Sequence, residues 1–581
     1  MKHARTLRLG GVAFAFIATL AVGVVLVSAA GASRTARAPR VTVTRAKLHY
    51  VGQVNLARLA STARSGHQRV YRQGAKLGAR PAGSKYHVVD QAILRHRLRA
   101  GRLGVSGNIP VTGGQVPGES GFFGISGPQQ AAANGGIDLE PPDQGLCAGN
   151  AVIGEFINNA LAFYNPSGHQ LSKTVPSYAF FKQPSSDFFS DPRCYYDAST
   201  RRWFLTEFIA PFGTSTAPPT QFLAISNGSN PLGSYKIWSF STADKHNPGC
   251  PCFGDFDQLG VDNNGIYIDT DEFGVSSNAF NGVIIYAVSK QTIEQVSHTG
   301  IPPTFFTYRL PIDNFGTPIY ITPAQSPPGA KFAPNTEYFV ESDGNAQSDN
   351  RLEVYAMHDT SDLATPAAPP MFGTEVKSER YAFPPDAAQK AGPIPLGKAN
   401  QDPEGQLQAD FDAIMEVTYT GGKLYAEADT ATVSGDGAAW FEITPKLTNS
   451  GIRATVAKQG YVTVKGQNLI YPVIAVNSAG HGYMAFTLSG HSYYPSSAYV
   501  RFTPAGPSGD IHVAKAGAAP EDSFTCYAAF VGPNYGGCRW GDYSMGVAMG
   551  SRVYQATEVI PPTGRDYLTN WGTFIWSAPA P

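Results

Sequence analysis

The stretch CRWGDYSMGVAMGSRVYQATE, Cys538–Glu558, consists of two runs typical of β-strands joined by a tight turn, with Asp542 ahead of the first run. Five other stretches follow the same plan of Asp or Pro, strand, polar or glycine turn and aromatic-rich strand. They are DQGLCAGNAVIGEFIN from Asp143, PRCYYDASTRRWFLTEF from Pro192, DQLGVDNNGIYIDTDEF from Asp257, DAIMEVTYTGGKLYAEAD from Asp412 and PVIAVNSAGHGYMAFTL from Pro472. A unit that recurs at this spacing indicates a repeat architecture.

The long gap between Asp257 and Asp412 has room for one more unit, and TEYFVESDGNAQSDNRLEVYAMHD from Thr336 supplies two strands for it. A second strand pair follows the first in several units, as in TQFLAISNGSNPLGSYKIWSF from Thr220. Seven units of four strands predict an all-β fold, a seven-bladed β-propeller. The alternation of Leu259 and Val261 in one strand predicts that one face of each strand is buried.

Asp542 lies at the entry of an inner strand, next to a turn. We expect its carboxylate to accept backbone N–H bonds there, because Asp or Pro recurs at this place and both fix a strand entry. The alternative is a ring of carboxylates around the axis that binds a cation.

The segments EPPDQGLCAGNAVIGEFINNALAFYNPSG, SDPRCYYDASTRRWFLTEF, FGDFDQLGVDNNGIYI, NGVIIYAVSK and RWGDYSMG…YQATEVI…TNWGTFIW resemble a family of secreted bacterial β-propellers of unassigned function. That uncharacterised family is related to the sialidase/neuraminidase-like propeller superfamily. The resemblance covers residues 137–579 and implies the fold, but it supplies no catalytic residues. The Asp-box of sialidases is not matched, and the nearest run, SGDGAAW from Ser434, is one residue short.

The N-terminus is typical of an export signal, with Lys2, Arg5 and Arg8 before an apolar stretch and a small-residue run. Cleavage before Ser33 is expected, giving a signal peptide over 1–32; an uncleaved anchor is the alternative. Residues 33–105 hold 16 Lys or Arg and one acid, whereas residues 106–581 hold 25 Lys or Arg and 43 acids. We therefore expect a flexible basic segment or pro-segment over 33–105, a Gly/Pro-rich linker over 106–136 and the propeller over 137–581.

The six cysteines of an exported chain predict disulfide bonds. Cys526 with Cys538 and Cys147 with Cys194 are the predicted pairs. Cys250 and Cys252 either bond to each other in a small ring or remain thiols.

The sequence contains neither a G-x-S-x-G nor an H-E-x-x-H motif, so it provides no nucleophile elbow and no zinc-protease helix. Asp255 and Asp257 are the candidate catalytic carboxylates, since a glycosidase needs two acids that face one cleft. Calcium is the expected metal, if any, with Asp343, Asn345 and Asp349 as candidate ligands, because oxygen ligands at alternate positions suit a hard cation.

The favoured function is a secreted or surface-associated binding propeller that recognises a glycan or a cell-surface protein without catalysis. The alternatives are a carbohydrate-active enzyme with acids at the axis and a structural envelope protein. The basic segment would contact an anionic wall polymer. No nucleic-acid motif is found, and no second apolar run of membrane-spanning length follows the signal. Fold alone does not choose among these functions.

Overall fold

The computed structural model describes residues 41–63, 103–104, 109–209, 217–277, 279–295, 302–310, 319–342, 348–409, 411–448, 451–532 and 537–581. The chain divides into two compact units, Met1–Thr35 and Ala36–Pro581. The first unit, with the expected signal peptide, lies outside the described residues, and so does most of the basic segment. The fold below is that of the second unit.

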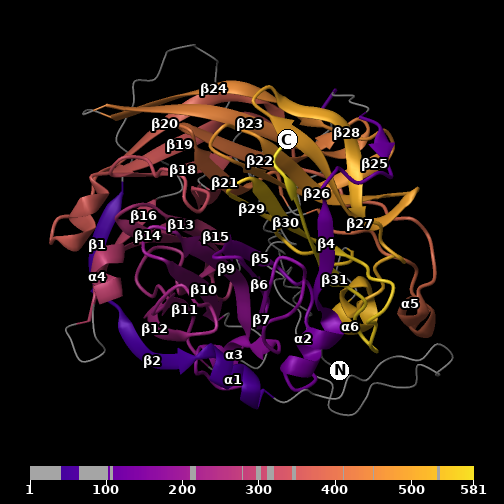
Figure 1. Ribbon diagram of the computed structural model, residues 1–581, viewed down its shortest axis with the longest axis horizontal. Helices are drawn as coiled ribbons and strands as arrows, with labels where there is room; N and C mark the ends of the chain where they lie inside the picture. The colour runs from indigo at the N-terminus through magenta and orange to yellow at the C-terminus, as the bar shows by residue number, and fades with distance from the viewer. Residues whose placement is uncertain are drawn as a thin grey trace, which may run out of the picture. The chain divides into compact units, whose positions relative to one another are not determined.

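Seven antiparallel sheets form the second unit, and each is one blade of a propeller (Figure 1). The innermost strands, in blade order 1 to 7, are β5 (Gly145–Gly149), β9 (Phe189–Asp197), β13 (Cys252–Val261), β17 (Ile319–Pro323), β21 (Ile414–Thr420), β25 (Gln467–Val476) and β29 (Met545–Met549). Each contacts the innermost strand of the next blade, and β29 contacts β5. The ring is therefore closed, and the predicted seven-bladed propeller is confirmed.

The remaining strands of each blade follow outward from the axis. The second strands are β6 (Val152–Ile157), β10 (Arg202–Ile209), β14 (Gly265–Gly274), β18 (Thr336–Ser342), β22 (Lys423–Thr432), β26 (Gly482–Gly490) and β30 (Arg552–Val559). The third strands are β7 (Ala160–Tyr164), β11 (Thr220–Ser226), β15 (Phe280–Ser289), β19 (Asp349–His358), β23 (Gly435–Thr448), β27 (Tyr493–Thr503) and β31 (Gly572–Pro579). The fourth strands are β8 (Val175–Pro176), β12 (Ser234–Ser241), β16 (Thr304–Leu310), β20 (Met371–Tyr381), β24 (Gly451–Val462), β28 (Gly506–Lys515) and β4 (Ser120–Ser126).

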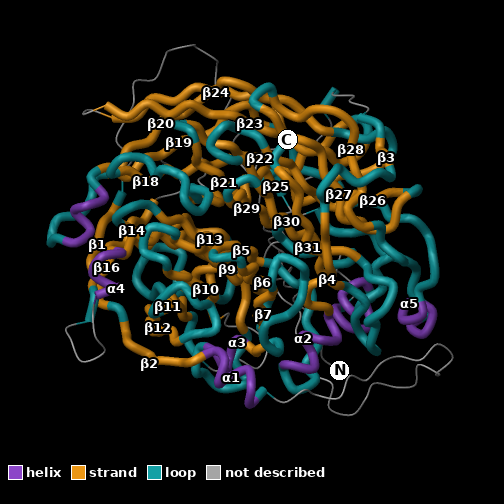
Figure 2. Tube along the Cα trace, viewed as in Figure 1, coloured by secondary structure: helices purple, strands orange, loops and turns teal. Residues whose placement is uncertain are grey.

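Helices are short and lie between or outside the sheets, as Figure 2 shows. They are α1 (Leu56–Thr62), α2 (Gly127–Ala133), α3 (Ser177–Phe180), α4 (Lys290–Gln295), α5 (Pro395–Asn400) and α6 (Ala528–Val531), with 3₁₀ turns η2 (Thr360–Ala364) and η3 (Phe524–Cys526). Among the described residues, none of these helices has the length and apolar character needed to cross a membrane.

The blades bury both faces of their inner strands. Every residue of β13 and β14 is buried. The expectation of one buried face was therefore wrong, because each blade is packed between two neighbours. Hydrophobic clusters fill all seven spaces between adjacent blades. All six tryptophans lie in these clusters and are at most 6 % exposed.

The first strand of blade 4 lies before Thr336, the residue at which the sequence analysis placed the start of this unit. Thr336–Ser342 is its second strand, and its innermost strand is Ile319–Pro323. The inner strand was missed because it is short and has a break in register with its neighbour.

The N-terminal part of the second unit belongs to the ring. Strand β1 (Thr42–Lys47) pairs with β16, and β2 (His49–Asn55) pairs with β12, so each adds a fifth strand to a blade edge (Figure 1). Leu48, Leu56 and Ala60 are buried there. The expectation of a purely flexible segment over 33–105 therefore does not hold for residues 42–62, since free blade edges offer unpaired backbone groups.

The segment expected to be a linker, 106–136, supplies two more strands. Strand β3 (Val111–Thr112) pairs with β28 in parallel, and β4 pairs with β31 as the outer strand of blade 7. The propeller thus starts before residue 137. The same sheet contains β4 and β29–β31, so the two ends of the propeller sequence close the ring together.

Candidate functional site

Asp542 is bound by a guanidinium. Arg539 Nη2 lies 2.8 and 2.6 Å from its two carboxylate oxygens, and both side chains are buried. The backbone N–H of Asp542 donates to Asp143 Oδ1 at 2.8 Å. We expected the carboxylate of Asp542 to accept a backbone N–H bond. At this strand entry it is the backbone N–H of Asp542 that donates, and the acceptor is the carboxylate of Asp143 in blade 1.

In other blades, too, an aspartate carboxylate accepts a backbone N–H from an innermost strand. Asp271 accepts the N–H of Tyr320 at 3.2 Å, and Asp429 accepts the N–H of Tyr471 at 3.0 Å. Tyr320 and Tyr471 have positive φ angles of 60° and 53°, and each lies where the register of its innermost strand is broken. Each aspartate belongs to the second strand of one blade and fixes the first strand of the next. These carboxylates therefore connect adjacent blades through hydrogen bonds.

A single arginine occupies the axis. From β9 in blade 2, Arg193 Nε donates to the carbonyl of Asp257 at 3.0 Å, and Nη1 lies 3.0 Å from Glu416 Oε1. Its guanidinium carbon lies 3.6 Å from the ring centroid of Tyr543. These partners belong to blades 3, 5 and 7, so the side chain reaches across the ring. The Arg193 side chain has no exposed surface.

An aromatic cluster lies beside this arginine. Phe256, Tyr320, Phe411 and Tyr543 are buried and come from blades 3, 4 and 7 and from the segment ahead of β21 in blade 5. Phe256 contacts the other three rings at centroid distances of 5.2 to 6.4 Å. Together with Arg193, these rings fill the middle of the propeller.

The predicted catalytic carboxylates lie within this closed region. Asp257 is 0 % exposed and accepts from Gln221 Nε2 at 2.6 Å; burial, then repulsion from Asp191, raises its pKa. Asp255 is 4 % exposed and accepts the N–H of Phe256 at 3.0 Å. A bulge separates the two aspartates, and Phe256 has a φ of 57°. The regular alternation that would place both on one side of the strand is therefore broken.

The predicted calcium loop is described only in part. Asp343 and Asn345 lie outside the described residues. Asp349 is bound by Arg351, whose Nη2 and Nε lie 3.0 and 3.1 Å from its carboxylate oxygens. Calcium binding at this loop stays a prediction.

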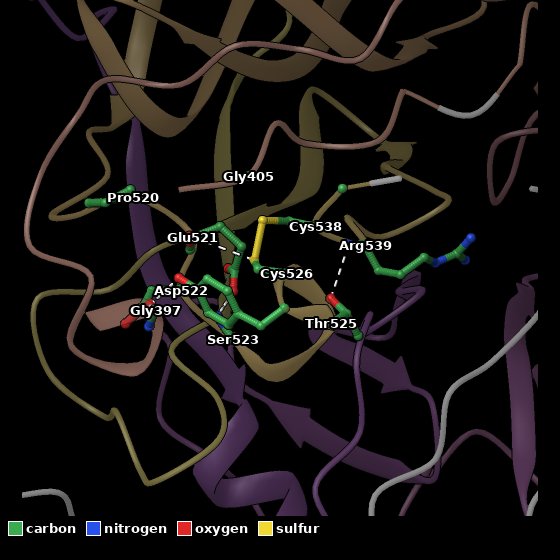
Figure 3. Close-up of a disulfide and its surroundings, with 12 residues drawn as sticks. Gly397, Gly405, Pro520, Glu521, Asp522, Ser523, Thr525, Cys526, Cys538 and Arg539 are labelled. Atoms are coloured by element: carbon green, nitrogen blue, oxygen red, sulfur yellow. Dashed lines mark hydrogen bonds between the residues drawn. A yellow bond between two sulfur atoms is a disulfide. The ribbon is translucent and has the colours of Figure 1, made fainter. Parts of the chain in front are cut away.

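The prediction of disulfide bonds is confirmed. Cys147–Cys194 joins β5 to β9, and Cys250–Cys252 forms a small ring, the first of the two states considered for that pair. Cys526–Cys538 closes the loop that contains α6. In Figure 3 this third bond lies between Glu521 and Thr525, and the backbone N–H of Arg539 donates to Thr525 Oγ1 at 3.0 Å. Closing such a loop stabilises a fold by about 3 kcal/mol in the chain-entropy model.

A pocket opens on the side where innermost strands turn into second strands. Its volume is about 480 Å³, and it lies between the turns after β9 and β13 and the loop before β18. Asp197, Ser199, Asn263 and Asn335 offer polar groups, and Lys331 adds a cation. Half-buried Phe332 supplies an aromatic wall. Ligand pockets commonly have this size and a few polar groups that converge.

The floor of this pocket is rigid. Lys290 Nζ lies 2.9 Å from Asp197 Oδ2 and donates to the carbonyl of Asp262 at 2.6 Å. The same ammonium lies 5.0 Å from the Phe332 ring centroid. Because Lys290 and Asp197 are both buried, their pair holds the two walls of the pocket in a fixed relation.

Sequence reasoning gave no ground for selecting Arg193, and it did not single out Glu416 or Tyr543. The residues that meet at the axis are far apart in sequence. The signal that could have been used is an arginine inside an inner strand, directly followed by the apolar and aromatic run Cys194–Tyr196.

Stability is expected to fall as pH rises. Burial raises the pKa of Glu416 to about 7, although Arg193 lowers it. An unfolded glutamate titrates near pH 4, so the folded chain holds the proton more tightly between about pH 4 and 7. This contribution is complete below pH 4 and is lost as pH rises through 7. We expect a difference of about 2–3 kcal/mol between pH 4 and pH 8 from this group.

The measurement is the melting temperature from pH 4 to 8 for the wild type and for Glu416→Gln, which cannot ionise. The variant should show a shallower decline. Glu375→Gln, at a glutamate on β20 whose side chain is 30 % exposed, is the control and should follow the wild type. Identical slopes for all three proteins would contradict the assignment to Glu416.

No protein-family model and no curated protein sequence matches the chain. Solved structures are similar at low identity. A glycoside hydrolase family 43 β-1,3-galactosidase is 11 % identical with a TM-score of 0.28, over 55 % of this chain and 95 % of that one. An exo-β-1,3-galactanase from Phanerochaete chrysosporium is 8 % identical with a TM-score of 0.26, over 76 % and 93 %. Trypanosoma rangeli sialidase is 11 % identical with a TM-score of 0.32, over 80 % and 60 %. These values do not bear on activity.

Proposed function

We propose that the protein is an exported, non-catalytic binding propeller that recognises a glycan through the pocket between blades 2, 3 and 4. The observation that carries the proposal is the contrast between the two candidate regions. Asp257 and Arg193 at the axis have no exposed surface. The pocket, by comparison, offers about 480 Å³ of accessible space.

The chemistry of the pocket favours a sugar over an apolar ligand. Amide, hydroxyl and ammonium groups of Asn263, Ser199 and Lys331 line it, and each can bond to a sugar hydroxyl. Phe332 offers one ring on which the apolar face of a sugar can pack. The tryptophans do not contribute, because all six are buried between blades.

The basic segment gives a second contact in this proposal. Within residues 33–105, β1 and β2 are attached to blade edges. The lysines and arginines between Arg64 and Arg102 would remain available for an anionic wall polymer. The propeller would thus be kept at the cell surface while its pocket engages a glycan.

A glycan array tests the proposal. The wild type should bind at least one class of glycan, and Asn263→Ala with Lys331→Ala should weaken that binding by about tenfold or more, equivalent to about 1.4 kcal/mol. Lys377→Ala, which removes an exposed lysine from the outer strand of blade 4, is the matched control and should bind normally.

A hydrolase panel on the same preparations separates the two functions. Release of sugar by the wild type, lost in Asp257→Asn, would overturn the non-catalytic proposal and support the enzyme alternative. If the pocket variant binds glycan as well as Lys377→Ala does, the glycan binds elsewhere on the ring and the assignment to this pocket is wrong.

A further inference from the structure

Three buried glutamates meet where the first blade joins the last. Glu140 lies in the segment between α2 and β5, Glu521 lies between β28 and η3, and Glu558 is on β30. Their exposed fractions are 0 %, 0 % and 1 %. One carboxylate oxygen of Glu140 and one of Glu521 lie within 4.8 Å of each other. Three segments that are far apart in sequence thus bring acids to one place.

Each glutamate accepts a backbone N–H bond through only one of its two carboxylate oxygens. The N–H of Thr525 donates to Glu140 Oε2 at 3.0 Å, that of Ser523 to Glu521 Oε1 at 2.7 Å, and that of Gly541 to Glu558 Oε2 at 2.6 Å. The other oxygens, Glu140 Oε1, Glu521 Oε2 and Glu558 Oε1, are buried and accept from no donor among the described residues. Such oxygens are costly to bury unless something binds them.

The nearby cations are already engaged. Arg539 binds Asp542 at 2.6 Å, and Arg565 binds Asp522 at 2.8 Å. Cys526 Sγ lies close to Glu140 and Glu521, but it is bonded to Cys538 and is not a free ligand (Figure 3). Arg539 still attracts the charge of Glu558, but neither guanidinium forms an ion pair with any of the three glutamates among the described residues.

We propose that Glu140, Glu521 and Glu558 form a calcium site that ties the entry of blade 1 to blade 7. Ca²⁺ takes oxygen ligands at about 2.3–2.6 Å, so two ligand oxygens of one ion lie up to about 5 Å apart. The separation of at most 4.8 Å between the Glu140 and Glu521 oxygens fits that limit. Glu558 lies outside this distance limit, so it would reach the ion through a water molecule.

A cation fits the arrangement better than shared protons do. A backbone N–H bond to a carboxylate favours its ionised form, and each of the three glutamates accepts one. A single proton can join only one pair of carboxylates and leaves the third uncompensated. A divalent ion can contact Glu140 and Glu521, attract Glu558 through a water molecule, and hold together the segments that carry them.

The main test is thermal unfolding of the full chain with calcium and with EGTA. After dialysis against EGTA at pH 7.5, addition of 10 mM CaCl₂ should raise the melting temperature by about 1–3 °C, which corresponds to the weak affinity of extracellular sites in a fold of this size. Glu140→Gln and Glu521→Gln should each abolish that shift, because the amide keeps the shape and removes the charge.

Glu207→Gln is the matched control. Glu207 is equally buried, and the N–H of Asn159 donates to its Oε1 at 3.1 Å, but it lies in blade 2. This variant should keep the full calcium shift. A shift that survives in Glu140→Gln and Glu521→Gln would place the ion elsewhere and overturn the proposal.

Terbium luminescence is a second measurement that needs no glutamate variant to fold. Trp571 donates from Nε1 to the carbonyl of Leu139, next to Glu140. Tb³⁺ bound at the site should therefore be excited through this indole, and the emission should fall by about half or more in Trp571→Phe and on addition of Ca²⁺. If the melting temperature is the same with Ca²⁺ and with EGTA, and no Tb³⁺ emission is seen, the glutamates hold protons and not a cation.

Discussion

Replacing Arg193 by alanine is expected to lower the free energy of unfolding by about 3–5 kcal/mol. The guanidinium contacts Glu416, the carbonyl of Asp257 and the ring of Tyr543 at once. At pH 8, where Glu416 with its pKa of about 7 is ionised, removing Arg193 leaves that buried charge without compensation, which is the costly case. Chemical denaturation, followed by tryptophan fluorescence, measures the loss.

A matched control is available in the adjacent strand. Arg202 on β10 pairs with Glu294 at 3.8 Å, and its side chain is 25 % exposed. Arg202→Ala should cost about 1 kcal/mol or less, as partly exposed pairs do. The double variant Arg193→Met with Glu416→Gln should recover part of the loss, since no charge is then left unpaired. Equal losses for Arg193→Ala and Arg202→Ala would contradict the role of Arg193 at the axis.

Shortening the chain from its N-terminus is expected to act in two steps. A chain that starts at Ile109 lacks β1 and β2 and should melt several degrees below one that starts at Val41, because two blade edges and the buried Leu48 and Leu56 are lost. A chain that starts at Gly136 also lacks β4 and should not form a closed, cooperatively unfolding ring.

The second step is the larger because β4 closes blade 7. Ile125 on β4 is 1 % exposed, and its N–H donates to both carboxylate oxygens of Glu155 at 3.2 and 3.0 Å. Glu155 belongs to blade 1, so β4 joins the last blade to the first. Calorimetry of the three chains is the measurement. A cooperative transition of unchanged temperature in the shortest chain would show that β4 is dispensable.

The sequence was sufficient for the repeat because each inner hairpin is local. Asp143, Asp412 and Asp542 precede innermost strands and Asp257 lies inside one, and the turn and the second strand that follow are encoded within about 20 residues. The all-β class and the number of blades follow from that local pattern. Burial of both strand faces does not, because it depends on how blades pack.

The axis and the blade edges were beyond sequence reasoning for a different reason. Arg193 and Glu416 lie 223 residues apart, and β2 meets β12 across a separation of 179 residues at Asn55 and Ser234. Nothing in either segment specifies its partner. Asp257 was selected as an acid in a strand, and only the packed ring shows that its carboxylate is enclosed.

The use of β4 as the outer strand of blade 7 has a consequence for how the chain reaches its folded state. Thr573 on β31 bonds to Ile125 on β4 across 448 residues of sequence. At translation rates of about 5–20 residues per second, β31 is made roughly 20–90 seconds after β4. During that interval the segment Phe122–Ile125 has no sheet to join. Recruitment of β4 by another chain during that interval would yield a domain-swapped dimer, in which β4 of one chain completes blade 7 of the other.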